Sequence, residues 1–240
     1  MKHIYKFTLP THVLGIGSAV AAAMWGQWQF FAFAFVIWCL LSIGIEVGAH
    51  RLFSHHAFKT KRWIEVLLMY LATIAGQGSI LFWVAVHKGY HHPFADSKED
   101  PHSPVNGFWR AYVGWLFDDT QKNISLRASM RLMKDKTQMF FHTHYYKVIM
   151  LTIVGLFLIN PWLVGAYLLA STIAIQQNFI VNVACHTPAL GYQTYWTRSL
   201  ATNIRRLTWR SWGLSLHNNH HVSPGGYNPA HDDKEFDPSA

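Results

Sequence analysis

Two long stretches of this 240-residue chain carry no charged side chain. One lies between Lys6 and Glu46, and the other runs from residue 148 to residue 197. A helix crosses the hydrocarbon core of a bilayer with about 20 apolar residues, so each stretch is long enough for two crossings. Polar breaks divide them at residues 26–29 (Gly-Gln-Trp-Gln) and 160–162 (Asn-Pro-Trp), where proline favours a turn. The pattern predicts two helical hairpins, with spans at about residues 9–25, 29–49, 146–160 and 162–184.

A third apolar segment, Ile64 to Val86, is also long enough to cross. Crossing would place His50 and His87 on opposite membrane faces, so we expect the segment to lie in or dip into the interface. Residues 76–79 (Gly-Gln-Gly-Ser) form a plausible break in it. The predicted fold is a single-domain, all-α integral membrane protein covering residues 1–240. Four transmembrane helices in two hairpins carry a cytoplasmic helical cap, formed by residues 50–145 and 185–240, that holds the metal site.

The basic residues orient this topology. Of the 20 Lys and Arg, two precede the first hairpin, 13 lie between the hairpins and five follow the second. The positive-inside rule therefore places both termini and the cap in the cytoplasm. The net charge of +8 is explained by this topology, and no basic helix or stacking motif indicates a nucleic acid. Two cysteines, Cys39 and Cys185, are too few for a disulfide framework or an iron–sulfur site.

Sixteen histidines are the most unusual feature of the composition. Eight of these histidines fall in three clusters: His50 and His55; His87, His91 and His92; His217, His220 and His221. On the predicted topology all three clusters face one compartment. Residues three or four apart share a helix face, which suits the second and third clusters. Residues five apart lie about 140° apart on an ideal α-helix, so the first pair converges only if its helix ends or bends.

Imidazoles without thiolates suit iron or zinc. About nine imidazoles exceed the needs of one zinc ion, which is usually four-coordinate, so two metals are the economical interpretation. Asn182 and His186, four apart near the end of the last span, form a further candidate pair. A metal transporter is the alternative from another class. Transporters place their ligands near mid-membrane, whereas these clusters lie at and beyond the span ends.

Together these motifs resemble the membrane fatty-acid desaturases, in particular the acyl-CoA delta-9 group. The resemblance runs from about Gly48 to the C-terminus. Besides the three clusters, it includes Asp100-Pro101-His102 and the pair Asn182 and His186. The residues before the third cluster, 213–216 (Gly-Leu-Ser-Leu), lack the acidic residue customary in that family. The resemblance implies a di-iron centre with nine ligands and one water-linked residue: His50, His55, His87, His91, His92, His186, His217, His220, His221 and, through water, Asn182.

The same resemblance implies an O2-dependent reaction that places a cis double bond in an acyl chain carried by CoA, acyl-carrier protein or a membrane lipid. Electrons would come from a ferredoxin, rubredoxin or b-type cytochrome. Hydroxylation, acetylenic-bond formation and oxidative decarboxylation are alternatives on the same scaffold. Glu46, one helical turn before His50, is a candidate hydrogen-bond partner for a ligand imidazole. Gln77 and Trp83 are candidates for the acyl pocket, with ordinary packing as an equal rival.

Overall fold

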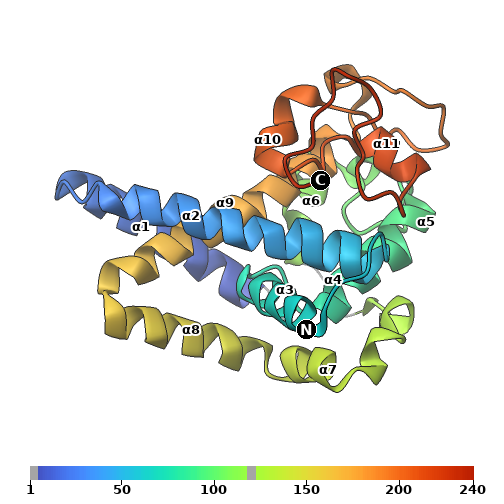
Figure 1. Ribbon diagram of the computed structural model, residues 1–240. Coiled ribbons are helices and arrows are strands. Elements are labelled where there is room, and N and C mark those ends of the chain that lie inside the picture. The colour runs from blue at the N-terminus through green and yellow to red at the C-terminus, as the bar shows by residue number, and fades with distance from the viewer. Residues whose placement is uncertain (1–4, 118–122) are drawn as a thin grey trace.

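Helices make up the computed structural model, which describes residues 5–117 and 123–240 (Figure 1). Within these two ranges there is no β-strand, and only two isolated bridges occur, Tyr192 to Asn203 and Asn203 to Leu216. The longer helices are α1 (Tyr5–Met24), α2 (Gln29–Ile43), α3 (Arg62–Ile74), α4 (Ile80–Val86), α7 (Lys136–Thr143), α8 (Tyr145–Ile159) and α9 (Pro161–Ala184). Two π-helical segments follow helices directly: η1 (Gly44–Ser54) and η2 (His87–His91).

Shorter elements fill the remainder of the described chain. The short α-helices are α5 (His92–Phe94), α6 (Phe108–Tyr112), α10 (Thr208–Ser211) and α11 (His217–Val222). The 3₁₀ turns are η3 (Pro104–Asn106), η4 (Gly114–Leu116), η6 (Leu126–Ser129), η7 (Leu132–Lys134), η8 (Pro188–Leu190) and η9 (Arg205–Leu207). The all-helical fold predicted from the sequence is confirmed for the residues that the structure describes.

Three helical stretches are long and apolar enough to cross a bilayer: Lys6–Met24, Gln29–Ser54 and Pro161–Ala184. A fourth arises if α7 and α8, which meet at an angle of 73°, count as one broken span. The 15 residues of α8 alone reach only about 23 Å at 1.5 Å per residue. The structure therefore supports three to four spans. The shortest of them is α8, which corresponds to the short span predicted at residues 146–160.

Both predicted hairpin turns occur where the polar breaks lie. Gly26, with φ of 66°, separates α1 from α2. Asn160 ends α8, and its side-chain oxygen accepts the N–H of Trp162 at 2.9 Å while Pro161 opens α9. The two turns lie side by side, because the rings of Trp25 and Trp162 meet edge to face with centroids 5.8 Å apart. In Figure 1 this end is at the left, and α5 and α11 are at the right.

Helix α9 is the central helix of the bundle. It packs against α1, α2, α6, α8 and α10, and 67% of its most apolar stretch is buried, against 22% for α1. The apolar segment Ile64 to Val86 does not form one helix. It breaks between α3 and α4 at residues 75–79, where Gly76 and Gly78 have positive φ, and neither half is long enough to span. The predicted break at Gly76–Ser79 is therefore confirmed.

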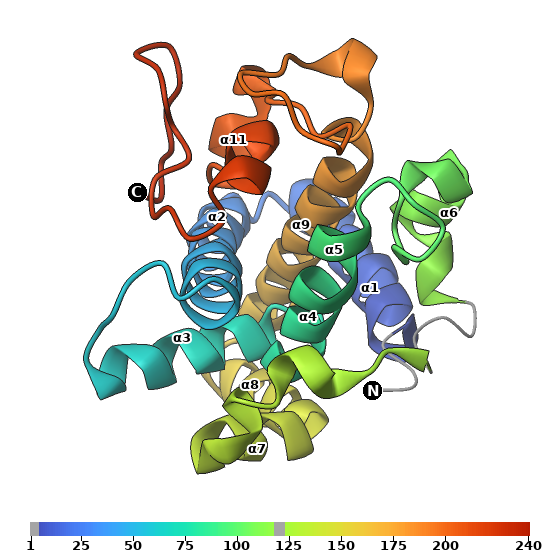
Figure 2. The same ribbon diagram turned by 90° about the vertical axis from the view of Figure 1, so that its right-hand side faces the viewer.

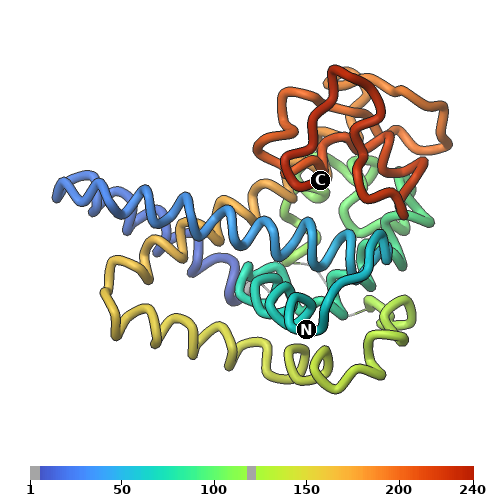
Figure 3. Tube along the Cα trace, in the orientation of Figure 1, coloured from blue at the N-terminus to red at the C-terminus, as the bar shows by residue number. Residues whose placement is uncertain are grey.

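The end of the molecule opposite the hairpin turns is covered by the C-terminal segment. Figure 2 looks onto this end, where α2, α5, α9 and α11 lie around one centre, and Figure 3 follows the chain after α11 as it folds back there. The buried guanidinium of Arg51 forms an ion pair with Asp237. Glu235 accepts hydrogen bonds from the side chains of Tyr192 and Asn219. These polar contacts fix the segment against α11.

Close packing of η1 on α3 yields a stability prediction. A Cβ added at Gly44 would lie 2.6 Å from the backbone of Leu71 and Ala72, so Gly44→Ala should lower stability by about 1–3 kcal/mol through overpacking. Gly17→Ala is the matched control, since that position in α1 has open space around it. Thermal unfolding in detergent, followed by intrinsic fluorescence, measures both. Equal melting temperatures for the two variants would contradict the close contact.

Candidate metal centre

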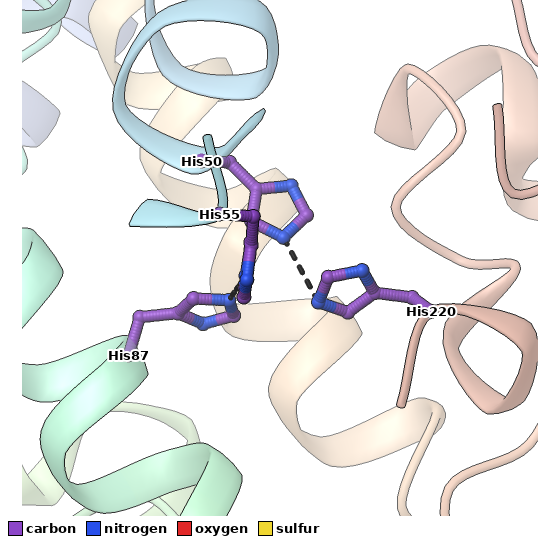
Figure 4. A group of neighbouring side chains, drawn as sticks. All are labelled: His50, His55, His87 and His220. Atoms are coloured by element: carbon purple, nitrogen blue, oxygen red, sulfur yellow. Dashed lines mark hydrogen bonds between the residues drawn. The ribbon is translucent and has the colours of Figure 1, made fainter. Parts of the chain in front are cut away.

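Five imidazoles form a first group at the end opposite the hairpin turns. Figure 4 shows four of them, His50 from η1, His55 directly after the end of η1, His87 from η2 and His220 from α11, with their rings turned toward one another. The Nε2 atoms of His50 and His220 are 3.1 Å apart, and those of His55 and His87 are 2.9 Å apart. His92 completes the group, because its Nε2 lies 3.0 Å from both His87 Nε2 and His220 Nε2.

Four imidazoles form a second group beside the first. His91, His186, His217 and His221 converge through their Nε2 atoms. His217 Nε2 lies 3.0 Å from His186 Nε2 and 3.1 Å from His221 Nε2, and the atoms of His91 and His221 are 3.2 Å apart. The groups are adjacent, with the rings of His92 and His221 only 4.8 Å apart. The structure thus brings together all nine histidines singled out in the sequence.

Helix geometry explains how the clusters supply both groups. The π-helix η1 is wound with i→i+5 hydrogen bonds, and the N–H of His55 donates to the carbonyl of His50 at 3.2 Å. Residues five apart therefore point the same way. The helix also ends at Ser54, between the two histidines, so the expectation that it ends or bends there is confirmed. In η2 the N–H of His92 likewise donates to the carbonyl of His87, which brings these two imidazoles into the first group.

Neighbouring histidines diverge to different groups. His91 belongs to the second group and His92 to the first, while His220 belongs to the first and His221 to the second. Successive residues of a helix point about 100° apart, so each adjacent pair reaches two centres from one short helix. This arrangement holds the two groups at a fixed spacing, since η2 and α11 each contribute to both.

The donor atoms fit metal ions better than they fit one another. A neutral imidazole carries one N–H, and a hydrogen bond holds that proton on the outer nitrogen of His91 and His186. Their Nε2 atoms are then acceptors facing other Nε2 atoms at 3.0–3.3 Å. Metal–imidazole bonds of about 2.1 Å place adjacent nitrogens of an octahedron about 3.0 Å apart. An ion at the middle of each group would satisfy these lone pairs.

Burial favours the unprotonated form of six of these imidazoles. Burial lowers the pKa of His87, His217, His220 and His221 well below that of a free imidazole. Burial, assisted by the positive charge of Lys88, also lowers the pKa of His55 to about 4. Burial and the neighbouring histidines lower the pKa of His92 to about 2. Metal ligation requires the unprotonated ring, so these side chains are ready ligands at neutral pH.

Two buried aspartates, which the sequence reasoning did not assign, hold the second group. His186 Nδ1 donates to Asp96 Oδ1 at 3.0 Å, and His91 Nδ1 donates to Asp100 Oδ2 at 2.9 Å. Asp96 has φ of 63° and also accepts the N–H of Leu200 at 2.6 Å. Asp100 accepts the backbone N–H of His102 as well. Such carboxylates fix the tautomer and orientation of a ligand. Their position just after the second histidine cluster in the sequence could have identified them as partners of the ligands.

Glu46 is the only acidic candidate that the sequence reasoning proposed. It is fully buried, and its Oε2 lies 3.4 Å from His50 Nδ1. Neither carboxylate oxygen forms a hydrogen bond within the described structure. Glu46 therefore lies in electrostatic contact with one imidazole of the first group, without the hydrogen bond expected from its spacing.

An apolar cavity reaches the two groups. Its walls come from α4, η4 and α9, and His87, His91 and His217 also line it. Asn182 lines it beside these imidazoles, as do Gln77 and Trp83. The indole of Trp83 lies 4.7 Å from the ring of His87. Gln77 donates to the carbonyl of Ala174 at 3.0 Å and accepts from Asn178. Both tentative pocket residues are thus part of the cavity wall.

Helices able to cross a bilayer and a histidine site able to hold metal ions place this protein in one class, that of membrane proteins with a candidate metal site. Comparison with known proteins identifies the family within this class. The family profile of the fatty acid desaturases matches residues 25–228, and the chain belongs to this family.

Curated relatives from Arabidopsis thaliana agree. Delta-9 desaturase-like 5 protein is 34% identical over 201 residues, 82% of this chain and 66% of the relative. Delta-9 acyl-lipid desaturase 2 is 32% identical over 85% of this chain and 67% of the relative. Palmitoyl-monogalactosyldiacylglycerol delta-7 desaturase is 33% identical over 82% of this chain and 54% of its own length. The chain thus spans about two thirds, or less, of the length of these relatives.

The aspartates yield a prediction about metal binding. Asp96→Asn keeps the shape of the side chain but removes the charge behind His186, so metal should be held about 10–100-fold more weakly. Metal titration of the purified apoprotein, with bound metal counted after desalting, measures the affinity. Asp233→Asn is the control, because Asp233 is an exposed carboxylate and the aspartates hydrogen-bonded to the histidine groups are Asp96 and Asp100. Unchanged affinity in Asp96→Asn would remove Asp96 from any role at the centre.

Proposed function

We propose that this protein is an O2-dependent fatty-acyl desaturase that introduces a cis double bond into an acyl chain. The observation that carries the proposal is the convergence of nine buried or half-buried imidazoles beside an apolar cavity in a member of this family. The names of the relatives, which are delta-9 and delta-7 desaturases, support the same reaction.

The nine histidines are proposed as ligands of two iron ions, five on one and four on the other. Asn182 is proposed to reach the four-histidine ion through water, since it lines the cavity beside His91 and His217. Bound iron would supply the oxidising power that removal of hydrogen from unactivated methylenes demands, with O2 as the oxidant. Asp96 and Asp100 would hold two of the ligand rings in place and offset part of the positive charge.

The cavity is proposed to bind the acyl chain. Its walls include Phe82, Leu116, Ile175 and Phe179, which exclude water and offer no competing polar partner to a methylene chain. Trp83 packs on His87 and would hold the chain against the histidine groups. The names of two relatives, an acyl-lipid desaturase and a palmitoyl-galactolipid desaturase, favour an acyl chain carried by a lipid over one on CoA or acyl-carrier protein.

We further propose four membrane spans, α1, α2 with η1, α8 and α9, under a single cytoplasmic cap. The adjacent hairpin turns and the distribution of the 20 basic residues support this orientation. Both termini and the histidine groups would then face the cytoplasm. A soluble electron donor, such as a ferredoxin, rubredoxin or b-type cytochrome, would be attracted to the basic cytoplasmic face if the donor is acidic.

Expression in a desaturase-deficient host, followed by gas chromatography of the fatty acids, tests the reaction. The protein should produce new internal cis alkenes, and His220→Ala should abolish them and reduce bound iron, because His220 Nε2 contacts two other donors of its group. His231→Ala, at an exposed histidine, should behave as wild type. Hydroxylated acids, acetylenic bonds or terminal alkenes without internal double bonds would identify another reaction on this scaffold. Metal uptake without any new product would favour transport.

The cavity walls yield a prediction about chain length. Ile175 is 2% exposed and lines the cavity, so Ile175→Trp should fill part of it and shift the products toward shorter acyl chains. Val154→Trp, on the exposed face of α8, should leave the product distribution unchanged. Chain lengths of the unsaturated products are read by mass spectrometry. Identical product lengths in wild type and Ile175→Trp would show that the substrate lies elsewhere.

A further inference from the structure

One face of the central helix α9 lines the acyl cavity, and a second face, turned away from it, lines a separate groove. Ile175, Asn178 and Asn182 line the cavity on one side of the helix. On the other side Ile173 and Ile180 line a groove between α9 and α2. The two faces share no residue, so the groove is a separate site that the proposed reaction does not use.

The groove consists of two depressions that share Trp38, Ile173 and Arg210. One is apolar and lies toward the hairpin turns, lined by Phe31, Ala34, Phe35 and Leu169. The other lies toward α10 and adds polar side chains, namely Thr172, Gln176, Gln177 and Ser211. From Leu169 to Val181 the lined part of α9 is about 18 Å long at 1.5 Å per residue. The groove therefore has an apolar part and a polar part, and Arg210 lines both of them.

Among the described residues, Arg210 is the only charged one that lines either depression. It is exposed, and within the described part of the chain it has no carboxylate partner. By contrast, Arg205 pairs with Asp232 and Arg51 pairs with Asp237. An arginine on an apolar surface between two candidate spans is costly without an anion nearby. The adjacent Trp209 is 67% exposed, as is typical of an aromatic side chain at a membrane interface.

We propose that this groove binds one anionic phospholipid, with its phosphate on Arg210 and one acyl chain along Phe31, Phe35 and Ile173. The guanidinium offers two parallel N–H donors, which suit a phosphate. The order of the contacts matches a lipid of one leaflet. The charged end lies at α10, on the histidine side of the bundle, and the apolar end points along the spans toward the hairpin turns. No acidic side chain of the groove opposes an anion.

The position of this lipid gives it a mechanical consequence for α9. It would pack against the back of the helix whose front lines the acyl cavity and carries Asn182. Gln177 already accepts from the indole of Trp38 at 3.2 Å across the same interface. A bound lipid would extend this contact and stabilise the α2–α9 pair, so an anionic phospholipid should raise the melting temperature of the whole protein.

Native mass spectrometry of the full chain, delipidated in detergent and titrated with phosphatidylglycerol or phosphatidylcholine, tests the proposal. Wild type should retain one phosphatidylglycerol and bind phosphatidylcholine at least fivefold more weakly. Arg210→Ala should weaken phosphatidylglycerol binding about fivefold, the usual contribution of one basic residue at an anionic lipid surface. Arg210→Lys should lose less, because the charge remains. Arg198→Ala is the matched control, an exposed arginine outside the groove that should bind as wild type.

A second variant tests the apolar end without touching the charge. Ile173 is 38% exposed and lines both depressions, so Ile173→Trp should block the acyl chain and weaken binding while Arg210 stays intact. A wild-type melting temperature in lipid-free detergent shows that each variant is folded. Equal binding of the two lipids, equal losses in Arg198→Ala and Arg210→Ala, displacement by free oleate at equal concentration, or cross-links showing a second copy of the chain in the groove would each overturn the proposal.

Discussion

Nine imidazoles that point their Nε2 atoms at one another impose the main constraint on this structure. Within each group Nε2 atoms lie 2.9–3.3 Å apart in a buried space, where unpaired acceptors are costly. A bound cation would satisfy several of these acceptors at once. The protein holds the rings together with contacts from outside the groups, such as the Asp96–His186 and Asp100–His91 hydrogen bonds and the covering C-terminal segment. Metal binding and stability of this end of the fold are thus linked.

Helix winding is the means by which short segments contribute imidazoles to both histidine groups. The π-helices η1 and η2 bring residues five apart onto one face. Adjacent residues of η2, α5 and α11 send imidazoles to different groups. Uneven support follows from this layout. The four-histidine group has two hydrogen-bonded aspartates, whereas the five-histidine group has one carboxylate, Glu46, in contact without a hydrogen bond. The two histidine groups therefore differ in their electrostatic surroundings.

Helix α9 joins the chemistry to the membrane. One face lines the apolar cavity and leads to His186, and the opposite face lines the groove at Arg210. Because α9 packs against α1, α2, α6, α8 and α10, displacement of this helix would change the cavity and the histidine groups together. A lipid on its back and an acyl chain on its front would be bound to one rigid element.

The sequence by itself determined the features that depend on local pattern. Charge-free lengths predicted the long helices, and glycine and proline marked the breaks at Gly26, Asn160 and Gly76–Ser79. Histidine spacing, together with the resemblance to a known family, selected the imidazoles that the fold gathers. Only the tertiary structure decided the division into five and four, the π-helical winding at His50–His55, the roles of Asp96 and Asp100, and the groove at Arg210. Each of these depends on distances between segments far apart in the chain. His50 and His220, for example, meet across 170 residues, and no local periodicity encodes such a contact.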